Sequence, residues 1–305
     1  MSILVIDKPS GPSSSFVCRK VRGLLGKQGE KVGHGGTLDP FASGVLPVCI
    51  GQGTKVVPFL LDADKAYEAL VRFGVETDTL DRTGQVLAEH SVAGLAGEAV
   101  AAALAEFRGT IAQVPPMYSA LKRDGRPLYA YARKGETVER PARQVTIHAL
   151  EMTVFEPPDR ARLRIRCSKG TYIRSLAADL GQRLGVGAHL LELRRTASGP
   201  FTIDQAITLD ELRARVAEGR ALPTISLLAA LVHLPKATVD QGQALVLERG
   251  QPMAWDELRG GRDLVGPVCA VVDGAGGPSL VAVVANDGQG GVKILRGFRP
   301  RPRDC

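Results

Sequence analysis

The chain lacks both a long apolar run and the features of a secretory leader. Its most apolar stretches, such as ISLLAALV over residues 225–232, are far shorter than the roughly 20 residues that a membrane-spanning helix needs. The N-terminus, MSILVIDKPSG, has no basic segment and only four apolar residues in a row, which argues against a signal peptide. These absences predict a cytoplasmic protein without a membrane segment.

The sequence also lacks the common motifs for metals and nucleotides. It contains neither the P-loop pattern nor G-x-G-x-x-G, and it lacks the H-x-E and P-C-x-x-C pair of zinc-dependent base deaminases. The cysteines are dispersed and none forms C-x-x-C, so we expect buried or incidental thiols and no metal site. They are Cys18, Cys49, Cys167, Cys269 and Cys305.

Positive charge is what the chain has in excess, with a formal net charge of +7. Residues 119–143 carry seven Lys/Arg against three Asp/Glu, with Tyr129 and Tyr131 among them. Residues 160–166, RARLRIR, place four arginines on one face of a predicted strand, with the apolar residues between them facing the core. Residues 293–305 hold five basic residues and one acidic residue. Each segment alone is explained equally well by a solvated surface and by a nucleic-acid-binding surface. The three together favour a nucleic-acid partner.

Length and pattern predict two domains of the α+β class. At 305 residues the chain is long for a single core, and strands and helices follow each other without strict alternation. We expect a boundary within residues 221–240, followed by short strands between Gly-rich turns, as in a small β-barrel. Helices are expected over residues 13–26, 97–109 and 171–185, and strands over 44–51, 65–74, 144–156, 160–168, 268–274, 279–287 and 292–298.

A single aspartate, Asp39, lies among six glycines in residues 31–55, KVGHGGTLDPFASGVLPVCIGQGTK. The glycines before it allow sharp bends and close approach of a ligand, and Pro40 restrains it to an extended or turn conformation. Such a segment can present one carboxylate rigidly into a cleft. An Asx-turn, in which Asp39 bonds only its own backbone, explains the same residues without a function.

Six blocks of the chain, in the same order, resemble the TruB-type tRNA pseudouridine synthases, which isomerise a uridine in the T-loop of tRNA. The blocks are DKPSGPSS (7–14), GHGGTLDPFASGVLPVCIGQGTK (33–55), KAYEALVRFG (65–74), QVPPMYSALKRDGRPLYAYARKGE (113–136), KGTYIRSLAADLG (169–181) and GAHLLELRRTASGPF (187–201). Two positions depart from the family pattern. Ser13 stands where Thr is usual, and Gly35 stands where Thr or Ala is common. Neither change removes a functional group.

The resemblance implies an enzyme that converts uridine 55 of tRNA to pseudouridine, with Asp39 as its nucleophile. The reaction breaks the N1–C1′ bond, turns the base over and joins C5 to C1′, so it needs no cofactor. Attack by Asp39 on C6 of the base and attack on C1′ of the ribose both fit. The alternative is a catalytically idle RNA-binding or tRNA-folding module on the same scaffold. The intact set of Asp39, Tyr67 and Arg174 argues against it.

The resemblance also assigns the residues around the target base. Arg174 matches the arginine that keeps the aspartate ionised, although a surface helix arginine has the same appearance in the sequence. Tyr67 matches the tyrosine that stacks on the flipped base near the departing proton, and by pattern alone it fits a core strand. Tyr172 and Leu193 match substrate-contacting positions. The two-residue spacing of Tyr172 and Arg174 puts both on one face of an extended backbone, whereas Leu193 by pattern is plain core.

Two further residues carry open alternatives. His34 matches a non-catalytic residue that fills the gap left by extruded nucleotides, although a lone histidine is more often structural. Lys8 either contacts an RNA phosphate or pairs with Asp7.

The last expectations concern RNA binding. The target base is stacked in the T-loop and has to be flipped out. Residues 115–143 are expected to form an exposed excursion that clamps the loop, with Arg123, Arg126 and Arg133 on the RNA backbone. The partner is tRNA, bound through its T-arm and T-loop, and we expect a monomer with no obligate protein partner.

The resemblance further implies the architecture. Residues 1–233 are expected to form a pseudouridine synthase fold, α+β, with a central mixed and mostly antiparallel sheet flanked by helices and loops. Residues 234–305 are expected to form a small β-barrel-like domain that is similar to the RNA-binding PUA domains.

Overall fold

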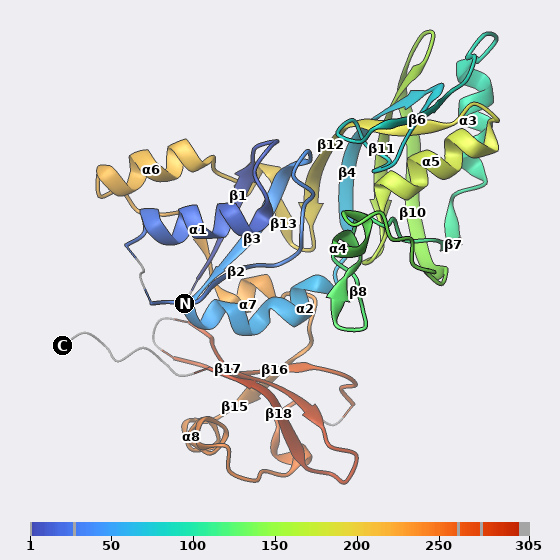
Figure 1. The fold of residues 1–305 in the computed structure, drawn as a ribbon. Coiled ribbons are helices and arrows are strands. Elements are labelled where there is room, and N and C mark those ends of the chain that lie inside the picture. Colours follow the sequence, from blue (N-terminus) through green and yellow to red (C-terminus); the bar gives the residue numbers. More distant parts are fainter. Residues whose placement is uncertain (1, 27–28, 261–262, 275–276, 299–305) are drawn as a thin grey trace.

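The computed structural model describes residues 2–26, 29–260, 263–274 and 277–298 (Figure 1). The strands of its larger sheet are β1 (Ser2–Lys8), β2 (Val32–His34), β3 (Ser43–Ile50), β4 (Lys65–Phe73), β7 (Gly109–Gln113), β10 (Arg143–Glu156), β11 (Arg160–Cys167), β12 (Ala188–Ser198), β13 (Phe201–Thr202) and β14 (Thr224–Ile225). The helices of this region are α1 (Ser14–Leu24), η1 (Gly51–Val56), α2 (Val57–Leu61), α3 (Gly97–Ala105), α4 (Leu128–Ala132), α5 (Ile173–Arg183), η2 (Ile203–Gln205), α6 (Leu209–Ala217) and α7 (Leu227–Ala230). Two hairpins pair β5 (Val75–Thr77) with β6 (Val86–Glu89) and β8 (Lys122–Arg123) with β9 (Arg126–Pro127).

The larger sheet is ten-stranded, in the order β14-β1-β3-β12-β4-β11-β10-β7, with β2 on β3 and β13 on β12. Its ladders are antiparallel except the one between β12 and β3. A second sheet holds β15 (Lys236–Val239), β16 (Val268–Val272), β17 (Ser279–Asn286) and β18 (Val292–Gly297), joined by α8 (Gln241–Arg249) and η3 (Trp255–Glu257). The predicted α+β fold, with a mixed and mostly antiparallel sheet and a separate C-terminal sheet, is confirmed. No helix within the described ranges has the length and apolar character that crossing a membrane requires.

The predicted helices are present with shifted ends. α1 begins after Ser13, whose side-chain oxygen accepts a hydrogen bond from the Phe16 N–H at 3.2 Å, as expected for an N-cap. The helix expected over 97–109 is shorter and ends at Ala105, because the chain turns there and enters β7 at Gly109.

The N-terminal half of the large sheet is covered on both faces. Leu4 and Ile6 of β1 pack with residues of α1 and α6. Ile3 and Val5 alternate with them and face a second apolar cluster, which includes α7 and the C-terminal sheet. Strand β1 is therefore packed on both faces.

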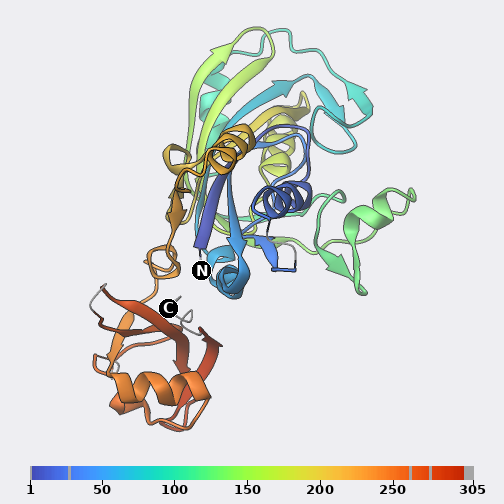
Figure 2. The same ribbon diagram turned by 90° about the vertical axis from the view of Figure 1, so that its left-hand side faces the viewer.

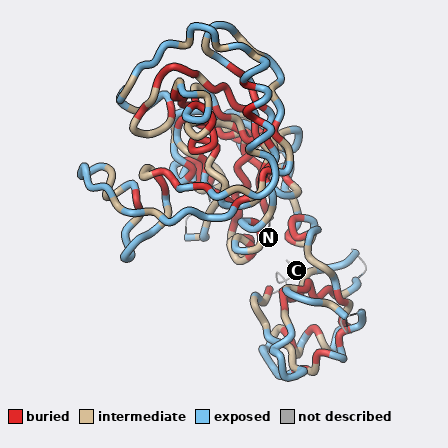
Figure 3. The backbone as a smooth tube through the Cα atoms, turned by 90° about the vertical axis from the view of Figure 1, so that its right-hand side faces the viewer, coloured by how far each residue is buried: buried red, intermediate tan, exposed pale blue. Residues whose placement is uncertain are grey.

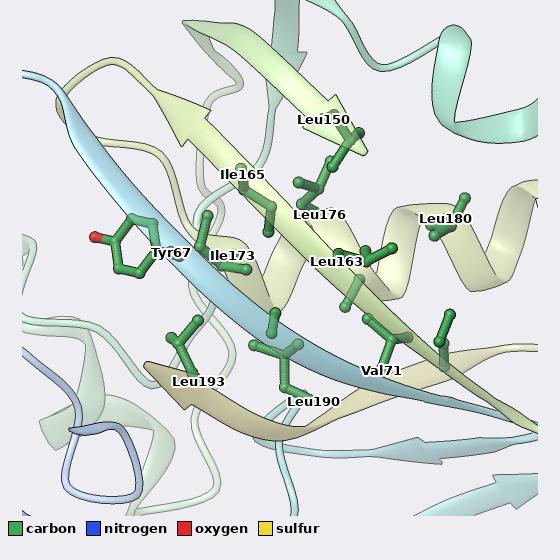
Figure 4. Close-up of a cluster of buried hydrophobic side chains, with 14 of the residues drawn as sticks. Tyr67, Val71, Leu150, Leu163, Ile165, Ile173, Leu176, Leu180, Leu190 and Leu193 are labelled. Carbon is green, nitrogen blue, oxygen red and sulfur yellow. The ribbon is translucent and has the colours of Figure 1, made fainter. Parts of the chain in front are cut away.

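The other half of the sheet, from β12 to β10, is buried on one face only. Figure 4 shows Tyr67 and Val71 of β4 and Leu163 and Ile165 of β11 in one apolar cluster with Leu176 of α5. Along β11 every second residue is buried, and the residues between are exposed. This confirms the predicted alternation of residues 160–166, with the four arginines on the solvent face.

The two halves meet at the parallel ladder of β3 and β12, where Gly44 permits close contact. Gly44 is the partner of Arg195 in this ladder. Its φ is +102°, and a Cβ built on it would overlap the backbone carbonyl oxygen of Arg195. Glycine is therefore required both for conformation and for space.

Before β10 begins at Arg143, residues 115–143 carry little regular structure, only β8, β9 and the five-residue α4. The segment projects from the body of the protein, in green in Figure 2, and most of its surface is exposed in Figure 3. Leu128 is an exception, at 4% exposure. The expectation of an exposed excursion is confirmed, whereas its contact with RNA stays a prediction.

The C-terminal sheet shares an apolar cluster with the rest of the chain. Its own core lies around Trp255 and α8. In addition, Cys269, Val271, Val283 and Phe298 pack in the cluster that holds Ile3 and Val5 of β1. The Lys55 ammonium donates a hydrogen bond to the Gly297 carbonyl at 2.7 Å across the same boundary. Deleting the C-terminal sheet would therefore expose apolar side chains of the ten-stranded sheet to water.

Gly44→Ala is expected to lower the free energy of unfolding more than Gly11→Ala does. The two glycines have similar φ angles, +102° and +113°, but a Cβ at Gly11 meets nothing within 4 Å. Both alanines carry conformational strain of about 1–3 kcal/mol, and only the one at position 44 forces β3 from β12. Urea denaturation of both variants measures the difference. If Gly44→Ala and Gly11→Ala lower the free energy of unfolding equally, the close contact of β3 with β12 at Gly44 does not contribute to stability.

Candidate active site

Five of the predicted site residues line a single pocket of about 340 Å³: Asp39, Tyr67, Tyr172, Arg174 and Leu193. They come from the loop between β2 and β3, from β4, from the start of α5 and from β12. The pocket is therefore assembled from segments far apart in the sequence.

Arg174 is the second residue of α5 and only 3% exposed, so the alternative of a surface helix arginine is wrong. Its Nε donates to Oδ2 of Asp39 at 2.9 Å. Its Nη1 and Nη2 donate to the backbone carbonyls of Thr79 and Tyr118 at 2.8 and 2.7 Å. Two neutral carbonyls thus orient the guanidinium, and its charge is directed at Asp39.

The electrostatics of Asp39 balance burial against this cation. Burial raises the pKa of Asp39, the Arg174 guanidinium opposes the rise, and the nearby Asp81 carboxylate adds to it. The Oδ2 of Asp81 lies 3.8 Å from Nη1 of Arg174, so two carboxylates compete for one guanidinium. A side chain that only closed an Asx-turn would not need this arrangement.

Buried polar side chains hold the backbone on both sides of Asp39. Ser14, 3% exposed, accepts from the Leu38 N–H and donates to the Leu38 carbonyl, both at 2.9 Å. The Lys8 ammonium donates to the Pro40 carbonyl at 3.1 Å. The segment that carries the carboxylate is therefore fixed from inside the protein.

Lys8 does not have either of the roles expected from the sequence. Its side chain is fully buried, and its ammonium also donates to the carbonyls of Pro9 and Pro12 at 2.8 and 2.9 Å. A phosphate cannot reach it in this structure, and Asp7 pairs instead with Arg194 at 2.8 Å. Burial lowers the pKa of Lys8 to about 8, against the opposing charge of Asp39. Lys8 is a support of the Asp39 loop.

Tyr67 is both a core residue and a pocket residue. It is 9% exposed, and its ring lies at the edge of the apolar cluster with its hydroxyl pointing away from it (Figure 4). Burial raises the pKa of its phenol, and the Arg195 guanidinium opposes that rise. The two sequence interpretations of Tyr67 are thus compatible.

Tyr172 immediately precedes α5, and the Gln113 side chain bonds its N–H and its carbonyl at 2.8 and 3.1 Å. Two-residue spacing in extended backbone does not align Tyr172 with Arg174, because Arg174 lies in α5. Both reach the pocket because the first turn of α5 points toward it.

Leu193 and His34 differ in their relation to the pocket. Leu193, 7% exposed, lines it and also belongs to the apolar cluster. His34 lies on β2 opposite Val48 and is not among the pocket-lining residues. Its Nδ1 is buried, with no hydrogen-bond partner in the described part of the chain, and burial lowers its pKa. Its contact with RNA stays a prediction.

The basic segments have different relations to the pocket. Arg123, Arg126 and Arg133 are exposed on the excursion, where the Arg133 guanidinium lies 5.4 Å from the centroid of the Tyr129 ring. In contrast, Arg164 is the cross-strand partner of Glu68, whereas the neighbouring Tyr67 pairs with the buried Ile165.

The arginines of residues 160–166 therefore lie on the sheet face opposite Tyr67. There Arg162 pairs with Glu156 at 2.6 Å, so this patch is a salt-bridged surface. Residues 299–305 of the basic tail lie outside the described residues.

Sequence reasoning missed several buried polar residues of the site, among them Ser14, Lys65 and Arg195. Lys65 and Arg195 line the pocket, and a count of alternate residues from Leu193 would have placed Arg195 on the same face. Ser14 and Arg195 hold carbonyls of distant segments, which no local pattern marks, whereas Lys65 donates to the nearby carbonyls of Leu61 and Ala63. Within the described residues, no group of three or more His, Cys, Asp or Glu side chains is placed to hold a metal ion.

Comparison with known proteins places this geometry in a family. Residues 22–173 match the family model for the N-terminal domain of TruB family pseudouridylate synthase, and residues 174–233 match that for the tRNA pseudouridylate synthase B C-terminal domain. A relative from Aromatoleum aromaticum, named tRNA pseudouridine synthase B, is 51% identical over 83% of this chain and 80% of its own length. A relative of the same name from Cupriavidus pinatubonensis is 46% identical over 92% of this chain and 89% of its own length.

Solved structures agree with the sequence relatives. A chain of a Cbf5–Nop10–Gar1 complex superposes with a TM-score of 0.75 at 30% identity, covering 98% of this chain and 85% of that chain. A chain of an archaeal box H/ACA sRNP Nop10–Cbf5 complex gives a TM-score of 0.73 at 27% identity, covering 98% and 86%. The protein described here belongs to the TruB family of pseudouridylate synthases.

Proposed function

We propose that this chain isomerises uridine to pseudouridine at position 55 in the T-loop of tRNA, with Asp39 as its nucleophile. The relatives supply the reaction class, since they are named tRNA pseudouridine synthase B. The observation that carries the role of Asp39 is its 2.9 Å ion pair with Arg174 inside a pocket of about 340 Å³. A pocket of this scale admits a flipped nucleotide, whereas a folded RNA loop stays outside it.

The proposed chemistry uses the residues of this pocket alone. Asp39 attacks the flipped nucleotide covalently, which divides a difficult rearrangement into easier steps. Arg174 opposes the rise in the pKa of Asp39 that burial causes, and so favours the ionised carboxylate. The Tyr67 ring stacks on the base, and its hydroxyl lies where the C5 proton leaves once C5 has joined C1′. The isomerisation is redox-neutral, so it consumes no oxidant or reductant.

Recognition of the T-arm is assigned to the exposed excursion and to the C-terminal sheet. The excursion, residues 115–143, presents exposed arginines and Tyr129, which suit phosphates and unstacked bases. We place the catalytic domain at residues 1–233 and the RNA-binding, PUA-like domain at 234–305. We propose that the chain acts as a monomer.

Asp39→Asn should abolish turnover and leave tRNA affinity nearly unchanged. Asparagine keeps the shape of the side chain but cannot act as the nucleophile, and the loss should be at least about 10⁴-fold. Release of C5 tritium from labelled tRNA measures turnover, and filter binding measures affinity. Multiple turnover by this variant would exclude Asp39 as the nucleophile, while a normal affinity with no wild-type activity would favour an idle RNA-binding module.

Tyr67→Phe should retain binding and lower the rate at saturating tRNA by about 10²–10⁴-fold, the range of general acid–base catalysis. Phenylalanine preserves ring packing at the edge of the core but removes the hydroxyl. Single-turnover kinetics report the effect. A rate within a few-fold of wild type would leave Tyr67 with a packing role only.

Replacing Arg123, Arg126 and Arg133 together by alanine should weaken tRNA binding and its dependence on salt. Each lost phosphate contact lowers the slope of log K against log salt by about 0.7–0.9. The matched control replaces Arg160, Arg164 and Arg166, which removes the same charge from the sheet face opposite Tyr67. If both triple variants lose the same affinity, only net charge matters and the excursion is not a clamp.

A further inference from the structure

Arg195 is a buried cation that has no role in the proposed chemistry of Asp39, Arg174 and Tyr67. It is 1% exposed, and each of its three guanidinium nitrogens donates to a backbone carbonyl. Nε bonds Val45 at 2.8 Å, Nη1 bonds Thr37 at 3.2 Å and Nη2 bonds Gly36 at 3.0 Å. Among the described residues, no carboxylate forms an ion pair with it, whereas the neighbouring Arg194 pairs with Asp7.

A buried charge without a counterion is expensive. Guanidinium stays protonated inside proteins, and even a paired buried ion is often replaced by apolar groups without loss of stability. Hydrogen bonds to carbonyls offset part of the desolvation cost but leave the positive charge uncompensated. Its field is felt by neighbours, since it lowers the pKa of Lys65, whose own value falls to about 8 mainly through burial.

Arg195 also joins the two groups to which we assigned the chemistry. On β12 it is the direct cross-strand partner of Tyr67 on β4, and both side chains line the pocket. Its guanidinium opposes the burial effect on the Tyr67 phenol, which means that it favours negative charge on that oxygen. At the same time it holds Gly36 and Thr37, immediately before Leu38 and Asp39.

We propose that Arg195 is a positioning residue that couples Asp39 to Tyr67. One guanidinium fixes the backbone leading to the nucleophile and presents its uncompensated charge to the Tyr67 hydroxyl, so the two groups keep a fixed relation across the flipped base. The inference rests on the proposed function, because it assumes that Asp39 and Tyr67 act on one nucleotide. It assigns Arg195 no contact with RNA.

The first test compares Arg195→Gln with Arg194→Gln. Arg195→Gln should lower kcat by about 10²-fold, the cost of a misplaced reacting group, with little change in the KM for tRNA. Arg194→Gln removes a half-exposed ion pair on the opposite face and should leave kcat unchanged. Melting temperatures of both variants are measured alongside. Equal effects on kcat, or a loss confined to KM, would overturn the proposal.

Arg195→Lys separates charge from hydrogen bonding and serves if the glutamine variant does not fold. Lysine retains the positive charge opposite Tyr67 but loses the planar fork. Its kcat should lie between those of wild type and Arg195→Gln, again with KM preserved. A lysine variant as slow as the glutamine variant, or as fast as wild type, would show that the charge and the fork do not act together.

A double-variant cycle tests whether Arg195 acts through Tyr67. In the Tyr67→Phe background, Arg195→Gln should cost clearly less in kcat than it does in wild type, because the hydroxyl that it serves is gone. If the fold-losses in kcat of the two single variants multiply to give that of the double variant, the two residues act independently and the proposed coupling is overturned. Wild-type conversion of tRNA uridine is measured in the same series, so failure of the proposed function would appear as an inactive wild type, and failure of this inference as an active one with independent residues.

Discussion

The ion pair between Asp39 and Arg174 is the interaction on which the rest of the site depends. A carboxylate withdrawn into a pocket tends toward its neutral form unless a cation compensates for the lost water. Arg174 supplies that cation, and its other nitrogens bond the carbonyls of Thr79 and Tyr118. The same guanidinium therefore ties α5 to the Asp39 loop, to the turn that follows β5 and to the base of the excursion.

The contacts of the Asp39 loop explain why glycines stand on both sides of it. Gly36 has a φ of +137° and lies against the Arg195 guanidinium, and Gly44 lets β3 approach β12. Between them the backbone bonds inward to Ser14, Lys8 and Arg195. The loop is thus stiff despite its composition, because buried polar groups require their partners and release them only at a cost.

The two halves of the large sheet differ in what covers their faces. Near the N-terminus both faces are covered, one by α1 and α6 and the other by α7 and the C-terminal sheet. Beyond β12 one face holds the core and the pocket, and the other is a charged, salt-bridged surface. The arginines of residues 160–166 therefore lie on this salt-bridged face, whereas Arg123, Arg126 and Arg133 are exposed on the excursion.

From the sequence alone we could predict the α+β class, the alternation of residues 160–166 and the strands β3, β4, β10, β11, β16, β17 and β18, but not β1 or β12. The sequence also indicated the pocket residues Asp39, Tyr67, Tyr172, Arg174 and Leu193. These rest on local periodicity or on blocks that resemble a family, both of which are properties of short segments. The tertiary structure was needed to show that Lys8 supports a loop, that Arg174 is buried against Asp39, and that Arg195 faces Tyr67. Each of those facts depends on backbone carbonyls or strand partners supplied by distant parts of the chain, and no local pattern encodes which carbonyl a buried cation will meet.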